Sequence, residues 1–155
     1  MNHWLIRVGD AYNLKHGKHA IWGVKRGKND SVKSRIQNKF NSGDIIWFIT
    51  NKEHGGKIIA MVEYIDFHDR EDETLININT ITNEEQGWKG DALWDIQINF
   101  KNYYDVEKHN FDISIACAAN ILSYTTFKEK GKISHDLEME YQLIKKYANV
   151  DKFKQ

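Results

Sequence analysis

Residues 44–66 read DIIWFIT (44–50), NKEHGGK (51–57) and IIAMVEYID (58–66). The first and third segments are short apolar runs rich in β-branched and aromatic residues, a composition that favours strands. The segment between them is polar and contains the pair Gly55-Gly56, which is typical of a tight turn. The pattern therefore predicts a β-hairpin in the middle of the chain.

Further strands are predicted on both sides of this hairpin. Residues 3–8, 75–81, 93–100 and 112–119 are apolar or alternating segments of strand length. In the third of these segments Ile96, Ile98 and Phe100 would share one face of a strand.

Two segments have helical periodicity. Residues 31–40 place Val32, Ile36 and Phe40 at a spacing of four, after possible cap residues at 29–31. Residues 134–148 have Ser134 as a cap and Glu138 near the capping-box position. Their apolar stripe consists of Leu137, Tyr141, Ile144 and Tyr147.

This order of elements predicts an α+β fold, a curved mixed sheet or small β-barrel of five to six strands with flanking helices. A chain of 155 residues has the size of one domain. It contains no proline and no internal repeat that would mark a boundary. We therefore expect a single domain over residues 1–155, with a C-terminal helix at about 134–148.

Two features bear on the compartment. The single cysteine, Cys117, lies in an apolar run, so a disulfide within the chain is excluded and a buried structural thiol is expected. Residues 1–8 are too short and polar for a signal peptide, and no apolar run approaches the ~20 residues that span a bilayer. We expect an intracellular protein of the cytoplasm or nucleus, not secreted and with no membrane partner.

Charge is distributed unevenly although the formal net charge is zero. Residues 1–60 carry 11 Lys and Arg against 4 Asp and Glu, whereas residues 61–155 carry 11 against 18. Segregation of this kind can form a basic face that attracts phosphate groups. It is also compatible with solvated surface charge that happens to cluster along the sequence.

The seven histidines are scattered, and none forms a His-x-x-x-His or Glu-x-x-His pair on a helix. We therefore expect no metal and no cofactor. The only candidates for a catalytic acid or base are Asp10, His19 and Asp91, which do not form a convincing constellation in the sequence. This favours a protein without enzymatic activity.

The five tryptophans divide into two groups by their surroundings. Trp22 and Trp88 lie in polar, glycine-flanked segments, whereas Trp4, Trp47 and Trp94 lie in strand-like runs where core packing is expected. Indoles on opposing loops can stack on a flat base. Trp22 and Trp88 are therefore the candidates for an aromatic pocket.

Several motifs occur in a familiar order: WLIR at 4–7, WGV at 22–24, SGDIIWF at 42–48, GKIIAMVE at 56–63, WKG at 88–90 and WDI at 94–96. In this order they resemble the EVE and YTH families of the PUA-like superfamily, over about residues 3–100. The resemblance implies a curved sheet or small barrel that binds modified bases. The bases are chiefly 6-methyladenine in RNA for YTH domains and modified DNA bases for several EVE members.

The resemblance also implies roles for individual residues. Trp22 matches the first cage tryptophan and Trp88 a second one. Asn13 lies near the residue that reads the Watson–Crick edge of the base, and Arg7 lies where a basic residue meets the backbone. Two departures are the Gly23-Val24 pair, which is closer to the EVE pattern than to the Ser/Thr pair of YTH domains, and Asn83, which stands where some YTH domains have a further cage tryptophan.

The sequence thus predicts a reader of RNA or DNA that holds a modified, methylated base in an aromatic cage. The predicted base-binding residues are Trp22, Trp88, Asn13, Gly23 and Asn83. The residues predicted to bind the nucleic-acid backbone are Arg7, Lys25, Arg26, Lys28, Lys33 and Arg35, which would supply a salt-sensitive share of the affinity.

This hypothesis makes a geometric prediction, namely that Trp22 and Trp88 face each other across an open pocket bordered by residues 25–35. If both indoles are buried in the core, the hypothesis in this form fails. Two alternatives remain open at this point: a nucleotide-processing enzyme, and a protein-interaction module whose acidic second half binds a basic partner.

Overall fold

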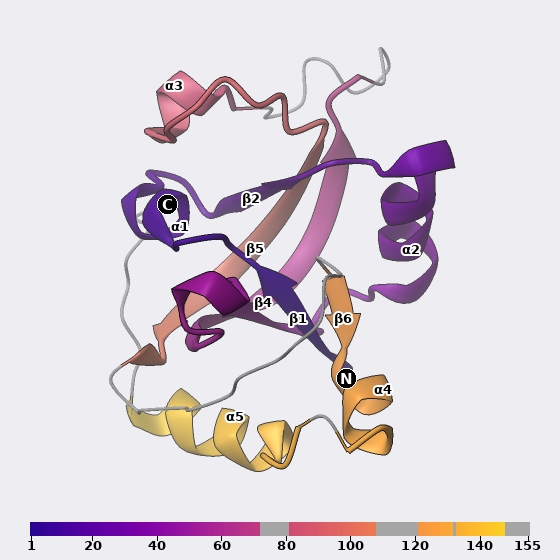
Figure 1. Cartoon of the computed structure of the whole chain (residues 1–155), viewed down its shortest axis with the longest axis vertical. Coiled ribbons are helices and arrows are strands. Elements are labelled where there is room, and N and C mark those ends of the chain that lie inside the picture. Colours follow the sequence, from indigo (N-terminus) through magenta and orange to yellow (C-terminus); the bar gives the residue numbers. More distant parts are fainter. Residues whose placement is uncertain (72–80, 108–120, 132, 148–155) are drawn as a thin grey trace.

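The structure is a computed structural model that describes residues 1–71, 81–107, 121–131 and 133–147 (Figure 1). The strands in this part of the chain are β1 His3–Arg7, β2 Ile21–Val24, β3 Ile45–Ile49, β4 Ile58–Asp69, β5 Ile96–Asp105 and β6 Ile121–Ser123. The helices are α1 Tyr12–His16, α2 Ser31–Lys39, α3 Asn83–Gln86, α4 Tyr124–Glu129 and α5 Leu137–Tyr147. Two short 3-10 turns, Lys28–Asp30 and Lys52–His54, complete them.

The strands form one mixed, curved sheet in the order β2-β5-β4-β3-β1-β6. Strands β1 and β3 are parallel, and all other neighbours are antiparallel. The predicted α+β class with a curved mixed sheet and flanking helices is confirmed. Among the described strands, β2 and β6 lie at the two edges of this order and do not pair with each other.

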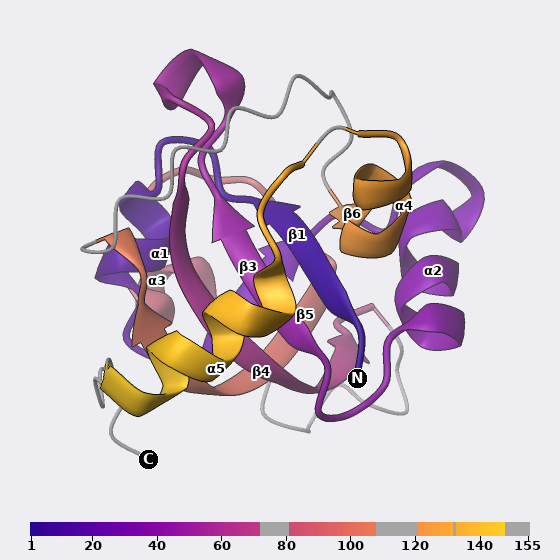
Figure 2. The same cartoon turned by 90° about the horizontal axis from the view of Figure 1, so that it is seen from below.

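Apolar side chains alternate between the two faces of the sheet and form a cluster on each. Trp4, Ile6 and Phe48 belong to the cluster that includes Leu14 of α1 and Ile36 of α2. Leu5 and Trp47 belong to the other cluster, which includes the buried residues of α4 and α5. Figure 2 shows α5 lying across the strands on this second face.

The predicted hairpin is confirmed, since β3 and β4 pair through a loop in which Gly55 and Gly56 have positive φ. The predicted helix 31–40 and the strand 3–8 are also found, as α2 and β1. The C-terminal helix begins at Leu137 rather than at residue 134, because Asp136 and not Ser134 caps it by accepting the Met139 N–H at 3.2 Å.

Other predictions about the elements need correction or lie outside the described residues. The strand predicted at 93–100 begins only at Ile96, and Trp22 lies in strand β2 instead of a loop. The strand predicted at 112–119, with Cys117, lies outside the described residues, as does the strand predicted at 75–81 except for Ile81, which is not in a strand.

Among the described residues no helix could cross a membrane: the longest, α5, has 11 residues.

Candidate functional site

The structure has a pocket of about 470 Å³ at the open side of the curved sheet. Its wall is formed by both edge strands, the end of β1, α1, the start of α2 and residues of the segment before β5. Its lining residues are Arg7, Val8, Gly9, Asp10, Tyr12, Asn13, Trp22, Gly23, Val24, Lys25, Gly27, Val32, Asn51, Lys89, Trp94 and Ile121. The pocket therefore combines three aromatic side chains with polar and cationic groups, as ligand sites commonly do.

A tight turn after β1 brings the first polar groups to the pocket. Gly9 and Ala11 adopt left-handed conformations with φ of 61° and 72°, which reverse the chain between β1 and α1. One oxygen of Asp10 accepts the Tyr12 N–H at 3.0 Å and so starts α1. This turn brings both Asp10 and Tyr12 to the pocket wall.

Trp94 forms part of the wall because Gly23 leaves space for it. A Cβ at Gly23 would lie 2.5 Å from Cβ and 2.7 Å from Cγ of Trp94, which is closer than such atoms can approach. Trp94 is only partly buried, so part of its indole is accessible from the pocket. Gly23 thus takes part in the site by allowing an indole to pack directly on β2.

Two lysines in the wall lie over aromatic rings. Nζ of Lys25 lies 5.5 Å from the Trp94 ring centroid and donates to the carbonyl oxygen of Leu93. Nζ of Lys89 lies 3.8 Å from the Tyr12 ring centroid. Both lysines are exposed. Cation–π contacts orient these side chains while their ammonium groups stay accessible to an anion.

The predicted pair of facing tryptophans is not formed. Trp22 and Trp88 are both buried, with exposed fractions of 8% and 7%. Their rings pack edge to face, with 5.6 Å between the ring centroids. Trp22 still lines the pocket, but Trp88 packs behind it and does not. The geometric prediction of an open pocket between these two indoles is therefore wrong, because the second indole in the wall is Trp94.

The two predicted asparagines bind main-chain atoms. Asn13 lines the pocket, but its amide accepts the Lys89 N–H at 2.9 Å and donates to the Lys89 carbonyl at 3.4 Å. Asn83 lies at the start of α3 and donates to the Ala92 carbonyl at 2.8 Å. Both side chains thus hold the segment that leads to Trp94.

The predicted backbone-binding residues Arg26 and Lys33 are paired with carboxylates. Arg26 contacts Asp69 at 2.6 Å, Asp30 at 3.0 Å and both Asp95 and Glu71 at 3.2 Å. Lys33 contacts the second oxygen of Asp69 at 2.8 Å. These ion pairs compete with phosphate for both cations.

The electrostatics of this group follow from the pairing. Burial alone would raise the pKa of Asp69, but the hydrogen bond from Lys33, the Glu71 N–H and the charges of Lys33 and Arg26 lower it overall. The hydrogen bond to Asp69 raises the pKa of Lys33 against the opposing effect of burial. Asp69 is therefore held as a carboxylate although the residue is only 4% exposed.

The other predicted cations have separate surroundings. Arg7 lines the pocket at the end of β1 and donates to the Thr50 carbonyl at 3.3 Å. Arg35 lies over the Trp4 ring and donates to the Ile121 carbonyl at 2.7 Å. Lys28 is exposed next to Gly27, which lines the pocket. Only Arg7 and Lys25 of the six predicted cations reach the pocket wall.

The candidate catalytic residues do not converge. Asp10 lines the pocket, whereas His19 and Asp91 do not, and the main chain of His19 is bound by Gln86. In the described part of the chain, no group of three or more His, Cys, Asp or Glu is arranged to hold a metal ion.

Trp94, Tyr12 and Lys89 are among the contributors to the wall that sequence reasoning missed. Trp94 was expected in the core, and it does pack against the first apolar cluster, but it is only partly buried and also lines the pocket. Nothing local marked Tyr12, because its position depends on the turn after β1. Lys89 lay within the quoted Trp-Lys-Gly motif but was not assigned a role.

No protein-family model matches the chain, and no curated protein matches it. Among solved structures, the chain is similar to a crystal structure of a Pseudomonas putida protein from a structural genomics consortium, with 14% identity and a TM-score of 0.34. The similarity covers 63% of this chain and 65% of that one.

Proposed function

We propose that this protein is a nucleic-acid-binding reader that holds a modified base, one carrying a methyl group, in the pocket walled by Trp22, Trp94 and Tyr12. The observation that carries the proposal is the composition of that pocket, in which three aromatic residues and the exposed Lys25 and Lys89 line one cavity. This wall replaces the predicted Trp22 and Trp88 cage, since Trp88 does not line the pocket, and the EVE and YTH resemblance supports only the class of ligand.

The aromatic groups suit a planar ligand. Stacking on an aromatic side chain contributes about 1 to 3 kcal/mol per base. A methyl group removed from water contributes roughly a further 0.8 kcal/mol. Trp94 and Tyr12 are the more accessible rings, whereas Trp22 offers only a small part of its surface. The Tyr12 ring, however, is stacked on the His16 ring with 4.0 Å between centroids and has Nζ of Lys89 at 3.8 Å. We therefore assign most of the stacking to Trp94.

The polar groups suit the remainder of a nucleotide. A carboxylate accepts hydrogen bonds, so Asp10 favours a base edge that presents an N–H, and Asn51 adds an amide to the same wall. Lys25, Lys89 and Arg7 supply positive charge for phosphates next to the bound base. The ligand class that combines these features is a base within RNA or DNA.

The test is a titration of labelled single-stranded RNA and DNA, unmodified or carrying methyladenine or methylcytosine, followed by fluorescence anisotropy. Wild-type protein is expected to prefer one modified oligonucleotide. Trp94→Ala should lower the affinity for it by about 5- to 150-fold, the loss of one stacking contact.

Leu93→Ala is the matched control, since Leu93 is the adjacent residue, is 80% exposed and does not line the pocket. Its affinities should equal those of the wild type. Weak, salt-sensitive binding of every oligonucleotide, unchanged by Trp94→Ala, would contradict the proposal and leave only nonspecific attraction to the lysines.

A further inference from the structure

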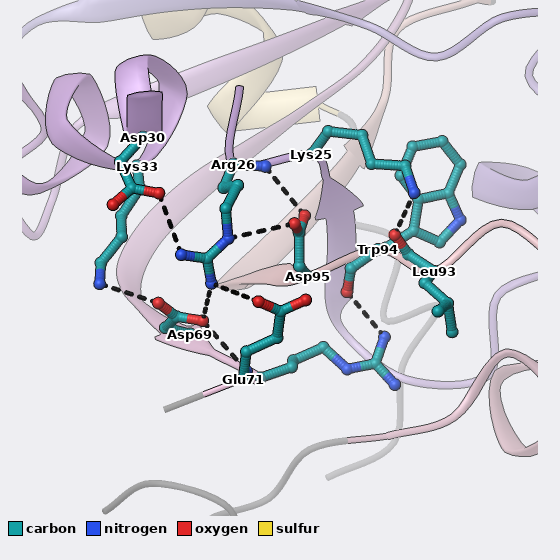
Figure 3. Close-up of polar contacts among 10 residues, drawn as sticks. Lys25, Arg26, Asp30, Lys33, Asp69, Glu71, Leu93, Trp94 and Asp95 are labelled. Atoms are coloured by element: carbon teal, nitrogen blue, oxygen red, sulfur yellow. Dashed lines mark hydrogen bonds and ion pairs between the residues drawn. The ribbon is translucent and has the colours of Figure 1, made fainter. Parts of the chain in front are cut away.

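We propose that the ion pairs around Arg26 act as a latch that sets the position of Trp94, so that Arg26 and Asp95 are positioning residues for the pocket. The latch consists of Arg26, Asp30, Lys33, Asp69, Glu71 and Asp95 (Figure 3). The structural part of this inference stands by itself, and its effect on base binding rests on the proposed function.

The segment 93–95 lies outside the sheet and is held by cationic side chains. Lys25 donates to the Leu93 carbonyl, and Arg70 donates to the Trp94 carbonyl at 3.0 Å. The Arg70 N–H also donates to the Asp95 carbonyl at 2.8 Å. Three successive residues are thus fixed from the ends of β2 and β4.

Asp95 makes the connection to the latch through both of its oxygens. One accepts the Arg26 backbone N–H at 2.8 Å, and the other accepts Nε of Arg26 at 3.2 Å. Figure 3 shows the Arg26 guanidinium between Asp95 on one side and Asp69 with Asp30 on the other. Arg26 therefore ties the residue after Trp94 to β4 and to the start of α2.

Trp94 has contacts on the pocket side that are sensitive to this placement. Its Cβ and Cγ lie against the Cα of Gly23, with no room for another atom between them. A small shift of segment 93–95 changes either this contact or the face that Trp94 presents to the pocket. Stacking requires a defined ring position, so the latch controls how well the wall fits a planar ligand.

In the latch, four carboxylates surround Arg26 and Lys33. Both cations are already paired, so they contribute little attraction for phosphate on that side of the pocket. Loosening the latch is therefore expected to reduce recognition of the base more than attraction to the backbone, and this difference separates a positioning role from a general loss of affinity.

The variants are Asp95→Ala, which removes both acceptors, and Asp95→Asn, which keeps one oxygen as an acceptor for the Arg26 N–H. Gly23→Ala displaces Trp94 from the opposite side. Glu63→Gln is the matched control, because Glu63 pairs with Lys101 at 3.1 Å between β4 and β5 and does not contact segment 93–95.

The first readout needs no ligand: fluorine NMR of protein labelled with fluorotryptophan, in which Trp94→Phe assigns the Trp94 signal. Asp95→Ala and Gly23→Ala should shift or broaden that signal and leave that of Trp47, buried on the other face of the sheet, in place. Asp95→Asn should lie between wild type and Asp95→Ala, and Glu63→Gln should match the wild type. An unchanged Trp94 signal in folded Asp95→Ala would overturn the latch.

The second readout is affinity for the preferred modified oligonucleotide and for the same oligonucleotide with an abasic site in place of the modified base, which keeps the backbone but cannot stack. Asp95→Ala should lower the first about tenfold, part of a full stacking loss, and change the second by less than about twofold. Equal losses for both would refute the positioning role. A shifted Trp94 signal in a protein that binds no oligonucleotide would retain the latch and reject the proposed function.

Discussion

At the scale of single residues, His3 is defined by two partners on opposite sides of its ring. The Trp47 indole can only donate, so the 2.9 Å contact makes Nδ1 of His3 an acceptor and places the proton on Nε2. Nε2 then donates to Glu138 at 2.6 Å. A buried histidine of β1 is thereby linked to the first turn of α5.

This contact gives a pH-dependent prediction. The hydrogen bond from His3 lowers the pKa of Glu138 below its usual value, so the carboxylate stabilises the fold above the unfolded pKa of about 4.3. This contribution is lost as the pH falls through the lower folded-state pKa. Glu138→Gln should cost about 0.5 to 1 kcal/mol at pH 7, the range for a half-exposed pair, and flatten the decline in the free energy of unfolding below pH 5.

Urea unfolding at a series of pH values measures both effects. Glu140→Gln on the same helix is the control and should retain the wild-type pH profile. A parallel decline for Glu138→Gln and wild type would show that the His3 contact does not contribute to folding stability.

At the scale of elements, α5 shows how strongly one helical face is bound to the sheet. Leu137 has no exposed surface and Ile144 only 2%, whereas Met139 is 62% and Leu143 50% exposed. The buried positions face Leu5 and Trp47 in the second apolar cluster. The apolar stripe in the sequence of this helix therefore corresponds to the face that packs on the sheet.

Leu137→Ala should destabilise the protein by about 2 to 5 kcal/mol, because it removes buried methyl groups and leaves a cavity. Leu143→Ala removes the same atoms from the exposed face of the same helix and should cost less than about 0.5 kcal/mol. Denaturant midpoints of the two variants, compared at an unchanged slope, measure the difference. Similar midpoints would contradict the packing of α5 described above.

At the scale of the whole molecule, the fold mixes charges that the sequence keeps apart. The basic first half contains Arg26 and Lys33, yet both pair with Asp69, which comes from the acidic second half. Lys15 likewise pairs with Glu107 at 3.0 Å. The positive charge available to a nucleic acid is therefore smaller than the count of residues suggests, because these three cations are already paired.

The salt dependence of binding tests this distribution. Lys89→Ala and Lys28→Ala should each reduce the slope of log affinity against log salt by about 0.7 for an unmodified single strand, the value for one phosphate contact. Lys146→Ala, on α5 at the other face of the sheet, should leave the slope unchanged. Equal slopes for all three variants would show that the phosphates do not contact Lys89 or Lys28.

The sequence by itself determined those features that depend on local order. The apolar, β-branched runs and the Gly-Gly turn in residues 44–66 predicted the hairpin, and the spacing of Val32, Ile36 and Phe40 predicted α2. These predictions succeeded because a strand or helix exposes its periodicity directly in the chain. The predicted ends of helices and strands were less accurate, because the residue that caps a helix, such as Asp136, depends on the structure around it.

Only the tertiary structure decided which aromatic side chains reach the pocket. Trp22 and Trp88 have similar surroundings in the sequence and Trp94 different ones, yet Trp88 is packed behind Trp22 while Trp94 occupies the space left by the missing side chain of Gly23. Likewise, the fold and not the charge pattern paired Arg26 with carboxylates from β4 and the segment before β5. Contacts between residues about 70 positions apart cannot be read from local order, because they depend on how the sheet curves.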